Sequence, residues 1–553
     1  MNRWLSKPVK SRLAVMLGVL CLSLPLPAQE KGYIPPFDFP IAFSGNFGEL
    51  RSNHFHGGLD FKTQGVSGKE VRALADGYIS RIRVTNGSGL VLDVHYQDGI
   101  TTINRHLSRF LPEMMARVED LQYLNRSYEV DIQPRPSEYP VRQGQVIAWS
   151  GNTGYSFGPH LHLDFVEEAT DEFIDPMPYF AQEVRDNTPP RAVGFMLFPQ
   201  VAQGVVNGAY TNKAVPLAPK ERITAWGVIG IGIKAFDYMD GVGNRYGVHT
   251  VVLEVDGVEQ FRSVVDRFSE DEHPYINSWV SQGYMKSFVE PGNKLRMLHP
   301  SNDNRGLLTI DEERPYQVEY TLKDYFGNTS KASFLIHGKR QEIPRPDSRQ
   351  SRKLRWNTAN IVQEPGLEVS IPRGCLYDDA YICVRSSLRD STALSYDYRL
   401  TDKPVAMHRY ADVSIGLLQK PVADESKYYI KCNGGSIGGH YEKGYIKGRT
   451  RQLGTFSVGI DTIPPTIFPV NEKSWGRQGR IVFKVQEKQT WVEGFGGEID
   501  GEFALFGKPN AVDGQIVCRL NPRRMQKGKQ HTLTFWATDA CGNKSEQRFS
   551  FFW

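Results

Sequence analysis

Histidines are concentrated in the N-terminal third of this chain. The sequence contains 13 histidines, and six of them lie between residues 54 and 162. Most of these fall in three short segments, Asn53–Phe61, Asn104–Ser108 and Gly158–Phe165. Imidazole titrates near neutral pH and is a common metal ligand. These segments are therefore where the sequence could do chemistry.

Two of the segments together contain a donor set for a metal ion. His160 and His162 are two residues apart in a predicted strand, so both side chains point to one face. His56 and Asp60 are separated by a Gly-Gly pair, where the backbone can bend so that both reach one point. Imidazole and carboxylate together suit zinc (Zn2+), and three protein ligands leave a fourth position for water, as in a catalytic site.

Each of these residues also has a structural interpretation. A single histidine in a strand is more often a core or surface residue than a ligand, so the combination carries the prediction. We expect His54 to lie at the rim of the site and His95, in an alternating strand, to be structural. Asp164 lies two residues beyond His162 on the same face. It either orients that ligand or is a charge at the strand edge.

In this order, the three segments resemble the lysostaphin-type, LytM-like zinc endopeptidases. Members of that family carry an HxxxD segment, an isolated His-Leu and a Gly-Pro-His-Leu-His strand. The matching segments here are His56–Asp60, His106-Leu107 and Gly158–His162. The resemblance covers about residues 40–180. It implies a small strand-built catalytic domain that cuts peptide bonds in the stems or crossbridges of peptidoglycan.

The resemblance also implies a role for each site residue. His56, Asp60 and His162 match the zinc ligands, and His106 and His160 match two catalytic histidines. No HExxH glutamate is present to act as the base. The two catalytic histidines would accept that proton, stabilise the developing oxyanion or protonate the leaving amine. Which histidine does which is open.

The sequence departs from the family pattern at three places. Asn104 stands where relatives often have Tyr, and Gly57 stands where Ser is common. Residues 109–140 form a longer insertion than the smallest members carry, and residues 108–126 have the apolar spacing of a helix. We expect these differences to affect substrate preference more than zinc binding, because the insertion could cap or narrow the groove.

The N-terminus is typical of an export signal. Residues 1–28 contain four Lys or Arg and no acid, and the apolar stretch Leu13–Leu24 precedes a small residue, Ala28. This stretch is short for a membrane span of roughly 20 residues, so a cleaved signal peptide is expected. We therefore predict export to the periplasm, the cell envelope or the outside, with no stable membrane span after cleavage.

The charge balance does not favour nucleic acid as a partner. The chain has 66 Lys and Arg against 62 Asp and Glu, and four of the basic residues lie in the expected signal. The mature chain would thus be close to neutral, and it has no long basic run. We expect no nucleic-acid binding. Peptidoglycan is the partner that the resemblance implies.

Short strand patterns and Gly turns predict a predominantly all-β, antiparallel protein. At 553 residues the chain is too long for one domain. After the signal, the expected units are a LytM-like peptidase domain at 29–185, a β-sandwich at 186–340, a linker with a second β-sandwich at 341–460, and a third, immunoglobulin-like β-sandwich at 461–553. The linker is expected at 338–355.

A faint repeat supports this division. Asp186–Pro190 and Asp461–Pro465 each open a unit with Asp-x-x-Pro-Pro, and Asp324–Asn328 and Asp539–Asn543 each close one with Asp-x-x-Gly-Asn. Bacterial immunoglobulin-like modules often have this texture. In the first repeat, the acid-rich turn with Asp237, Asp240 and Asn244 is a calcium candidate, although such turns are usually solvated surface.

Three functions fit these observations. The first is an exported zinc endopeptidase acting on peptidoglycan, and the presence of all five site residues favours it. The second is a non-hydrolytic relative that binds the wall or activates another hydrolase, and the third is a zinc peptidase acting on proteins. The β modules would serve as spacers, bind the wall or an envelope protein partner, or cover the groove. Five cysteines follow the signal, and their pairing is open.

Overall fold

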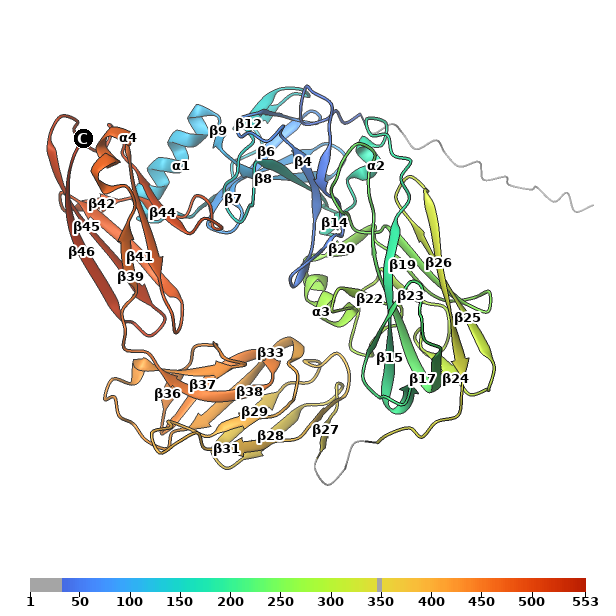
Figure 1. Ribbon diagram of the computed structural model, residues 1–553. Coiled ribbons are helices and arrows are strands. Elements are labelled where there is room, and N and C mark those ends of the chain that lie inside the picture. The colour runs from blue at the N-terminus through green and yellow to red at the C-terminus, as the bar shows by residue number, and fades with distance from the viewer. Residues whose placement is uncertain (1–31, 346–350) are drawn as a thin grey trace, which may run out of the picture.

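The computed structural model describes residues 32–345 and 351–553, so the expected signal peptide at 1–28 lies outside the described residues. The described chain is mostly antiparallel β-sheet with a few short helices, as the sequence predicts. No helix in this part of the chain is both long and apolar enough to cross a membrane. Figure 1 shows the sheets following one another in chain order around a ring, from blue through green and orange to red.

The first unit (residues 32–185) is built on one large sheet. Its strand order is β1 (Phe43–Gly45), β4 (Gly58–Lys62), β13 (His160–Glu167), β8 (Ile100–Leu107), β7 (Gly89–Tyr96), β6 (Gly77–Thr85) and β10 (Val130–Ile132), with β11 (Pro140–Val141) paired to β6 and β14 (Glu172–Ile174) paired to β13. The unit also has a small sheet with the order β5 (Glu70–Arg72), β12 (Val146–Trp149), β9 (Arg109–Phe110). A separate hairpin pairs β2 (Leu50–Arg51) with β3 (His54–Phe55).

The large and the small sheet share one apolar core. Leu59, Ile82 and Leu163 of the large sheet and Val71 and Ile147 of the small sheet belong to the same cluster of buried side chains. Two helices cover this core, α1 (Pro112–Asn125) and α2 (Met177–Phe180). The expected helix at 108–126 is therefore confirmed as α1, which buries Met114 and Val118.

The second unit (residues 186–345) contains a long, strongly bent sheet. Its order is β16 (Lys213–Pro216), β15 (Arg191–Val206), β17 (Ile223–Phe236), β26 (Thr329–Gly338), β25 (Pro315–Lys323), β18 (Thr250–Val255), β19 (Val258–Val264) and β23 (Leu298–Pro300), with β21 (Val280–Ser281), β22 (Tyr284–Lys286) and β24 (Leu308–Ile310) at its side. The pairing of β17 with β26 is parallel. The turns η1 (Glu270–Tyr275) and α3 (Ile276–Trp279) lie in its irregular middle.

The first two units share a sheet and a core across the expected boundary at residue 185. The strand β20 (Arg267–Ser269) of the second unit pairs with β14 of the first unit. Phe268 of β20 is fully buried, and its ring centroid lies 5.0 Å from that of Phe47, 5.3 Å from that of Phe55 and 5.7 Å from that of Phe173. The irregular middle of the second unit is therefore the part that packs on the first.

The third and fourth units each contain two facing sheets around one core. In the third unit (residues 351–460), one sheet has the strand order β28 (Asn360–Glu364), β29 (Leu367–Ile371), β33 (Val405–Gly416), β37 (Tyr445–Leu453), β36 (His440–Glu442). The other sheet has the order β31 (Arg385–Ser387), β32 (Asp397–Arg399), β38 (Thr455–Ile460), β34 (Tyr428–Cys432), β35 (Gly435–Ser436). The 3-10 helix η2 (Glu425–Lys427) precedes β34. In the fourth unit (residues 461–553), one sheet has the strand order β39 (Thr466–Pro469), β40 (Arg480–Gln486), β44 (Gln515–Arg519), β43 (Phe506–Gly507). The other sheet has the order β42 (Glu502–Ala504), β41 (Val492–Ile499), β45 (Gln530–Asp539), β46 (Lys544–Phe552). The unit also contains the 3-10 helix η3 (Glu472–Ser474) and the helix α4 (Trp475–Gln478). Their immunoglobulin-like character stays a prediction.

The described part of the expected linker at 338–355 is not all irregular. A short strand, β27 (Arg352–Leu354), pairs with β30 (Ala380–Ile382) and so belongs to the third unit. Leu354 is fully buried in the core of that unit, which explains why a segment rich in Lys, Arg and Pro still forms a strand there. The five cysteines of the described residues are free thiols.

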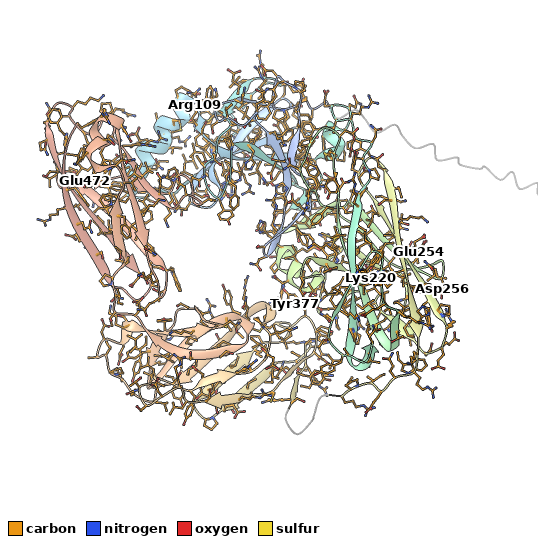
Figure 2. All side chains as sticks on the ribbon, viewed as in Figure 1. Arg109, Lys220, Glu254, Asp256, Tyr377 and Glu472 are labelled. Carbon is orange, nitrogen blue, oxygen red and sulfur yellow. The ribbon has the colours of Figure 1, made fainter. Side chains whose placement is uncertain are left out.

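Contacts between consecutive units, and between the last unit and the first, close the ring. The Tyr377 hydroxyl of the third unit donates to the carbonyl of Pro274 in the second at 2.6 Å, and Figure 2 labels Tyr377 at this junction. Lys427 of the third unit donates to the Cys541 carbonyl of the fourth at 2.9 Å. The fourth unit then lies beside α1 of the first, where the ring centroids of Tyr123 and Phe503 are 5.7 Å apart (Figure 1).

Candidate metal centre and active site

Two neighbouring strands bring the expected zinc ligands together. β4 and β13 are antiparallel, and Asp60 lies directly opposite His162 in their register. Side chains of such cross-strand pairs lie on one face of the sheet at close range. The backbones also approach closely, because a Cβ atom added at Gly58 would lie 2.1 Å from the Leu163 carbonyl oxygen. Gly58 therefore allows the close packing of β4 against β13.

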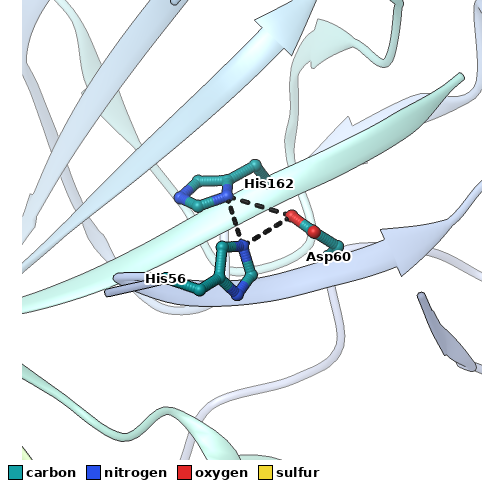
Figure 3. A group of neighbouring side chains, drawn as sticks. All are labelled: His56, Asp60 and His162. Atoms are coloured by element: carbon teal, nitrogen blue, oxygen red, sulfur yellow. Dashed lines mark hydrogen bonds and ion pairs between the residues drawn. The ribbon is translucent and has the colours of Figure 1, made fainter. Parts of the chain in front are cut away.

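The structure places His56, Asp60 and His162 around one point (Figure 3). The His56 Nε2 atom lies 2.9 Å from Asp60 Oδ1 and 2.9 Å from His162 Nδ1, and His162 Nδ1 lies 3.0 Å from Asp60 Oδ1. All three side chains are buried. The sequence prediction that these three residues converge thus agrees with the geometry.

The hydrogen bonds around the trio determine which atoms face its centre. The His56 Nδ1–H donates to the Asn46 carbonyl at 2.6 Å, so Nε2 presents a lone pair. The His162 Nε2–H donates to Asp164 Oδ1, so Nδ1 faces the other two residues. A single proton on His162 Nδ1 could bond to Asp60, but His56 Nε2 would still face an acceptor. A cation held by all three atoms satisfies the set, and zinc takes such nitrogen and oxygen ligands at about 2.0–2.2 Å.

Two arginines hold the carboxylates of the site. Arg51 contacts Asp60 Oδ2 at 3.2 Å, which leaves Oδ1 for the centre of the trio. Arg105 donates from Nε to Asp164 Oδ2 at 2.7 Å. Of the two interpretations of Asp164, the structure supports the one in which it orients His162. Neither arginine belongs to a metal-binding pattern, so sequence reasoning missed both.

The charges of this group reinforce one another. Burial alone would raise the pKa of the Asp60 carboxyl, but the neighbouring His56 and His162 hold that pKa well below its usual range. Burial alone would lower the pKa of His162, but the Asp164 and Asp60 carboxylates raise it to about 9. The site is therefore built to hold positive charge at His162, either as a proton or as a bound cation.

His160 and His106 lie beside the trio. His160 Nε2 is 3.5 Å from Asp60 Oδ1, and the ring centroids of His106 and His160 are 4.8 Å apart. Burial lowers the pKa of His106 to about 3 and also lowers the pKa of His160, so both rings are neutral at neutral pH. His106 has a φ of 64°, a left-handed conformation that costs energy for a residue with a Cβ and that clusters at functional sites.

One loop, Asn152–Gly158, orients both of these histidines. The His106 Nδ1–H donates to the Thr153 carbonyl at 2.8 Å, and the His160 Nδ1–H donates to the Gly158 carbonyl at 2.9 Å. The Ser156 hydroxyl lies 3.3 Å from His160 Nδ1. Each ring thus has its Nδ1 proton fixed and its Nε2 available for a reaction.

The fourth unit holds this loop from the outside. The Gly154 N–H donates to the Pro509 carbonyl at 2.8 Å, and the Ala511 N–H donates to the Gly154 carbonyl at 2.8 Å. The Asn510 side chain donates to the carbonyls of Asn152 at 2.7 Å and Ser156 at 3.0 Å. This contact joins residues that are more than 350 positions apart, and nothing in the local sequence of Asn510 predicts it.

The other histidines of this region, and the positions that depart from the family pattern, lie outside the trio. His54 is exposed outside the trio, and His95 contacts Glu168 at the far end of β7. Asn104 is buried and donates to the Leu92 carbonyl at 3.1 Å. A Cβ atom at Gly57 would lie 2.8 Å from Asp164 Oδ1, so a side chain there would displace that carboxylate. The insertion at 109–140 contains α1, which contacts the fourth unit.

Comparisons with known proteins find relatives whose names describe peptidases. The chain is 32% identical over 155 residues to the glycyl-glycine endopeptidase ALE-1 of Staphylococcus capitis, an alignment that covers 27% of this chain and 32% of that protein. It is 30% identical over 115 residues to the DD-carboxypeptidase/endopeptidase Mpg of Neisseria meningitidis serogroup B, covering 21% of each. The catalytic domain of lysostaphin from Staphylococcus simulans is a structural neighbour with 26% identity and a TM-score of 0.19, covering 25% of this chain and 89% of that domain.

Site and relatives together define a peptidase class: the chain carries a lysostaphin-type, LytM-like peptidase domain. The chain spans about a third of the length of the first relative and about a fifth of the second. A separate family model, the Zu5-like domain, matches residues 351–461, which correspond to the third unit.

Proposed function

We propose that this protein is an exported zinc-dependent endopeptidase that hydrolyses peptide bonds in the stem peptides or cross-links of peptidoglycan. The observation that carries the proposal is the trio of His56 Nε2, Asp60 Oδ1 and His162 Nδ1, three facing acceptor atoms within about 3 Å of one another. Two relatives with peptidase names, one of them a glycyl-glycine endopeptidase, support a peptide bond as the target.

His56, Asp60 and His162 would hold the zinc ion, which when bound polarises the scissile carbonyl and lowers the pKa of water. The neutral imidazoles of His106 and His160 can each accept a proton at Nε2 and later return it to the leaving amine. Because their Nδ1 protons are fixed by backbone carbonyls, these rings are oriented before substrate binds. Either histidine can fill either role.

Neighbouring charged side chains orient two of the proposed ligands for a metal ion. Arg51 occupies the second oxygen of Asp60, and Asp164 and Arg105 fix the ring of His162. Such outer partners restrict the ligands to one orientation and commonly raise metal affinity by about 10- to 100-fold. The peptidase would act in the periplasm, the cell envelope or outside the cell, as the N-terminal sequence pattern predicts.

Digestion of purified peptidoglycan tests the proposal. Zinc-loaded protein should release peptides from cross-linked material, and a chelator should stop the reaction. His162→Ala should bind no zinc at the site and release nothing, whereas the matched control His54→Ala should behave like the wild type. The masses of the released fragments would identify the bond that is cut.

Two other outcomes would each overturn the proposal. Binding to peptidoglycan without any cleavage by the zinc-loaded protein would indicate a non-hydrolytic wall-binding or hydrolase-activating role. Zinc-dependent cleavage of protein substrates with no release from peptidoglycan would indicate a protein-directed peptidase. In both cases the zinc content of His162→Ala would still report whether the trio binds the metal.

A further inference from the structure

A second cluster of carboxylates lies outside the peptidase site, at the junction between the first two units. Asp186 precedes the Pro-Pro pair that leads into β15, Asp237 directly follows β17, and Asp324 follows β25. One carboxylate oxygen of each lies within 4.8 Å of one from the other two. The sequence repeat contains Asp186 and Asp324, and the acid-rich turn contains Asp237. Only the fold places the three carboxylates together.

The side chains of the other two residues of the acid-rich turn bond elsewhere. The Asn244 side chain donates to the Ser44 carbonyl at 3.2 Å, and Asp240 accepts from the side chains of Asn187 and Thr188. Of the three turn residues Asp237, Asp240 and Asn244, Asp237 is the one whose carboxylate groups with the repeat residues.

Hydrogen bonds fix two of the three carboxylates from one side. Asp324 accepts from the Asn328 N–H at 2.8 Å and from the Asn328 side chain at 2.7 Å. Asp186 Oδ1 accepts from the backbone N–H groups of Thr188 at 3.0 Å and Asp240 at 3.2 Å. These donors hold the two groups in place.

Two oxygen atoms of the cluster lack any partner. Asp186 Oδ2 and Asp237 Oδ1 are buried and accept no hydrogen bond. Asp237 is only 3% exposed and Asp186 only 8%. No Lys, Arg or His of the described chain forms an ion pair with any of the three carboxylates. A buried acceptor left unpaired costs about 1–3 kcal/mol, and more for a charged group, so a cation between these carboxylates would stabilise the cluster.

We propose that Asp186, Asp237 and Asp324 bind a calcium ion. The donor set is oxygen only, which suits a hard divalent cation and contrasts with the imidazole-rich trio of the peptidase site. Calcium tolerates irregular geometry and commonly completes its coordination with backbone carbonyls and water. The ion would neutralise buried carboxylates with which no Lys, Arg or His of the described residues forms an ion pair.

The position of the cluster gives the ion a structural role. A small cavity beside it is lined by residues of both units, including Asn46 of the first unit and Asp237 and Asp324 of the second. The Asn328 side chain also donates to the Asp186 carbonyl at 3.1 Å, which ties the start of the second unit to its last hairpin. Bound calcium would link the start, the middle and the last hairpin of the second unit, beside its contact with the first unit.

The fourth unit repeats the arrangement with one difference. Asp461 and Asp539 occupy the same motif positions, and Glu487 directly follows β40 as Asp237 follows β17. There, however, Asp461 Oδ2 accepts from the Thr490 hydroxyl at 3.0 Å, and Glu487 Oε1 accepts from three backbone N–H groups. The proposal is therefore made for the first cluster alone.

Calcium binding to the zinc-loaded, full-length protein tests the proposal. Calorimetric titration and tyrosine-sensitised terbium luminescence should show one more site in the wild type than in Asp237→Asn. Calcium at about 1 mM, within the range of extracellular calcium modules, should raise the Tm of the wild type more than that of the variant. Zinc content should be equal in both, which separates this site from the peptidase site.

The matched control is Asp256→Asn, which removes an exposed carboxylate of the same unit, labelled in Figure 2. It should bind calcium like the wild type. Equal calcium stoichiometry and affinity in the wild type and in Asp237→Asn would overturn the proposal. If Asp237→Asn fails to fold, Asp186→Asn replaces it. A wild-type protein whose Tm and terbium signal do not respond would overturn the proposal without any variant.

Discussion

At the scale of single residues, the site depends on partners that carry no chemistry of their own. His162 contacts the centre of the trio through Nδ1 because its Nε2–H is engaged by Asp164, and Asp164 is in turn held by Arg105. The family resemblance of the three histidine segments pointed to the trio and to the two neighbouring rings, and the fold brings these five residues together. It could not identify Arg51 or Arg105, because an arginine next to a motif is usually a surface charge.

We expect Asp164→Asn to weaken zinc binding by about 10- to 100-fold, because the amide can still accept the His162 proton but no longer supplies a negative charge. Competition with a chromogenic chelator measures the affinity. The control is Glu168→Gln, which changes a carboxylate that contacts His95 away from the site. An unchanged zinc affinity in Asp164→Asn would show that the carboxylate is only a structural partner of Arg105.

At the scale of elements, the strands were predictable and their long-range pairing was not. The alternation in β13 correctly placed His160, His162 and Asp164 on one face. The pairing of β14 with β20 joins segments almost 100 residues apart in sequence, and neither segment is distinctive by itself. A peptidase domain ending at residue 185 would leave Phe47, Phe55 and Phe173 without Phe268.

We expect Phe268→Ala to destabilise the protein by about 3–5 kcal/mol, because it removes a fully buried ring from the core that the first two units share. Thermal unfolding followed by calorimetry would show a lower Tm for the transition of these units. The control is Phe468→Ala, which truncates a ring that is 46% exposed in the fourth unit. Equal Tm values for the two variants would contradict the shared core.

The junction also predicts a pH effect. Burial, with a smaller contribution from the charge of Asp266, raises the pKa of the Asp175 carboxyl to about 7. Between about pH 4 and 7 the folded protein therefore keeps a proton that the unfolded chain has lost, so stability falls as the pH rises through this range.

Asp175→Asn should remove that fall. We expect its Tm relative to the wild type to increase from pH 4 to pH 7, by an amount that corresponds to roughly 3 kcal/mol. Calorimetry at a series of pH values measures the difference. The exposed Asp303, changed to Asn, is the control and should show no such trend. A difference that does not vary with pH would mean that Asp175 is ionised in the folded protein.

At the scale of the whole molecule, the last unit contacts the loop that orients the catalytic histidines. The Asn510 side chain donates hydrogen bonds to two carbonyls of the Asn152–Gly158 loop. The Thr153 carbonyl of the same loop accepts a hydrogen bond from His106 Nδ1–H. Composition and motifs divided the chain into units in sequence. They contained no sign that the fourth unit returns to the first, because the residues in contact are more than 350 positions apart in the sequence.

We expect Asn510→Ala to lower kcat by about fivefold without changing zinc content, which corresponds to about 1 kcal/mol for the lost hydrogen bonds. Hydrogen exchange at the amides of Gly154 and Ala511 should become faster. The control is Arg524→Ala, which loses the ion pair with Asp120 on α1 at the same interface. Should both variants lower kcat equally, the effect would belong to the docking of the whole unit and not to the loop.

The closure of the ring also determines how the protein would respond to a single break in its backbone. A nick at the exposed Arg345, between the second and third units, would end covalent continuity there. The two fragments would nevertheless remain in one particle, held on one side by the Tyr377 contact with Pro274 and on the other by the contacts of Asn510 and Arg524. A linear string of the same units would come apart. The loop around His106 and His160 would thus keep its outer support even in a clipped molecule.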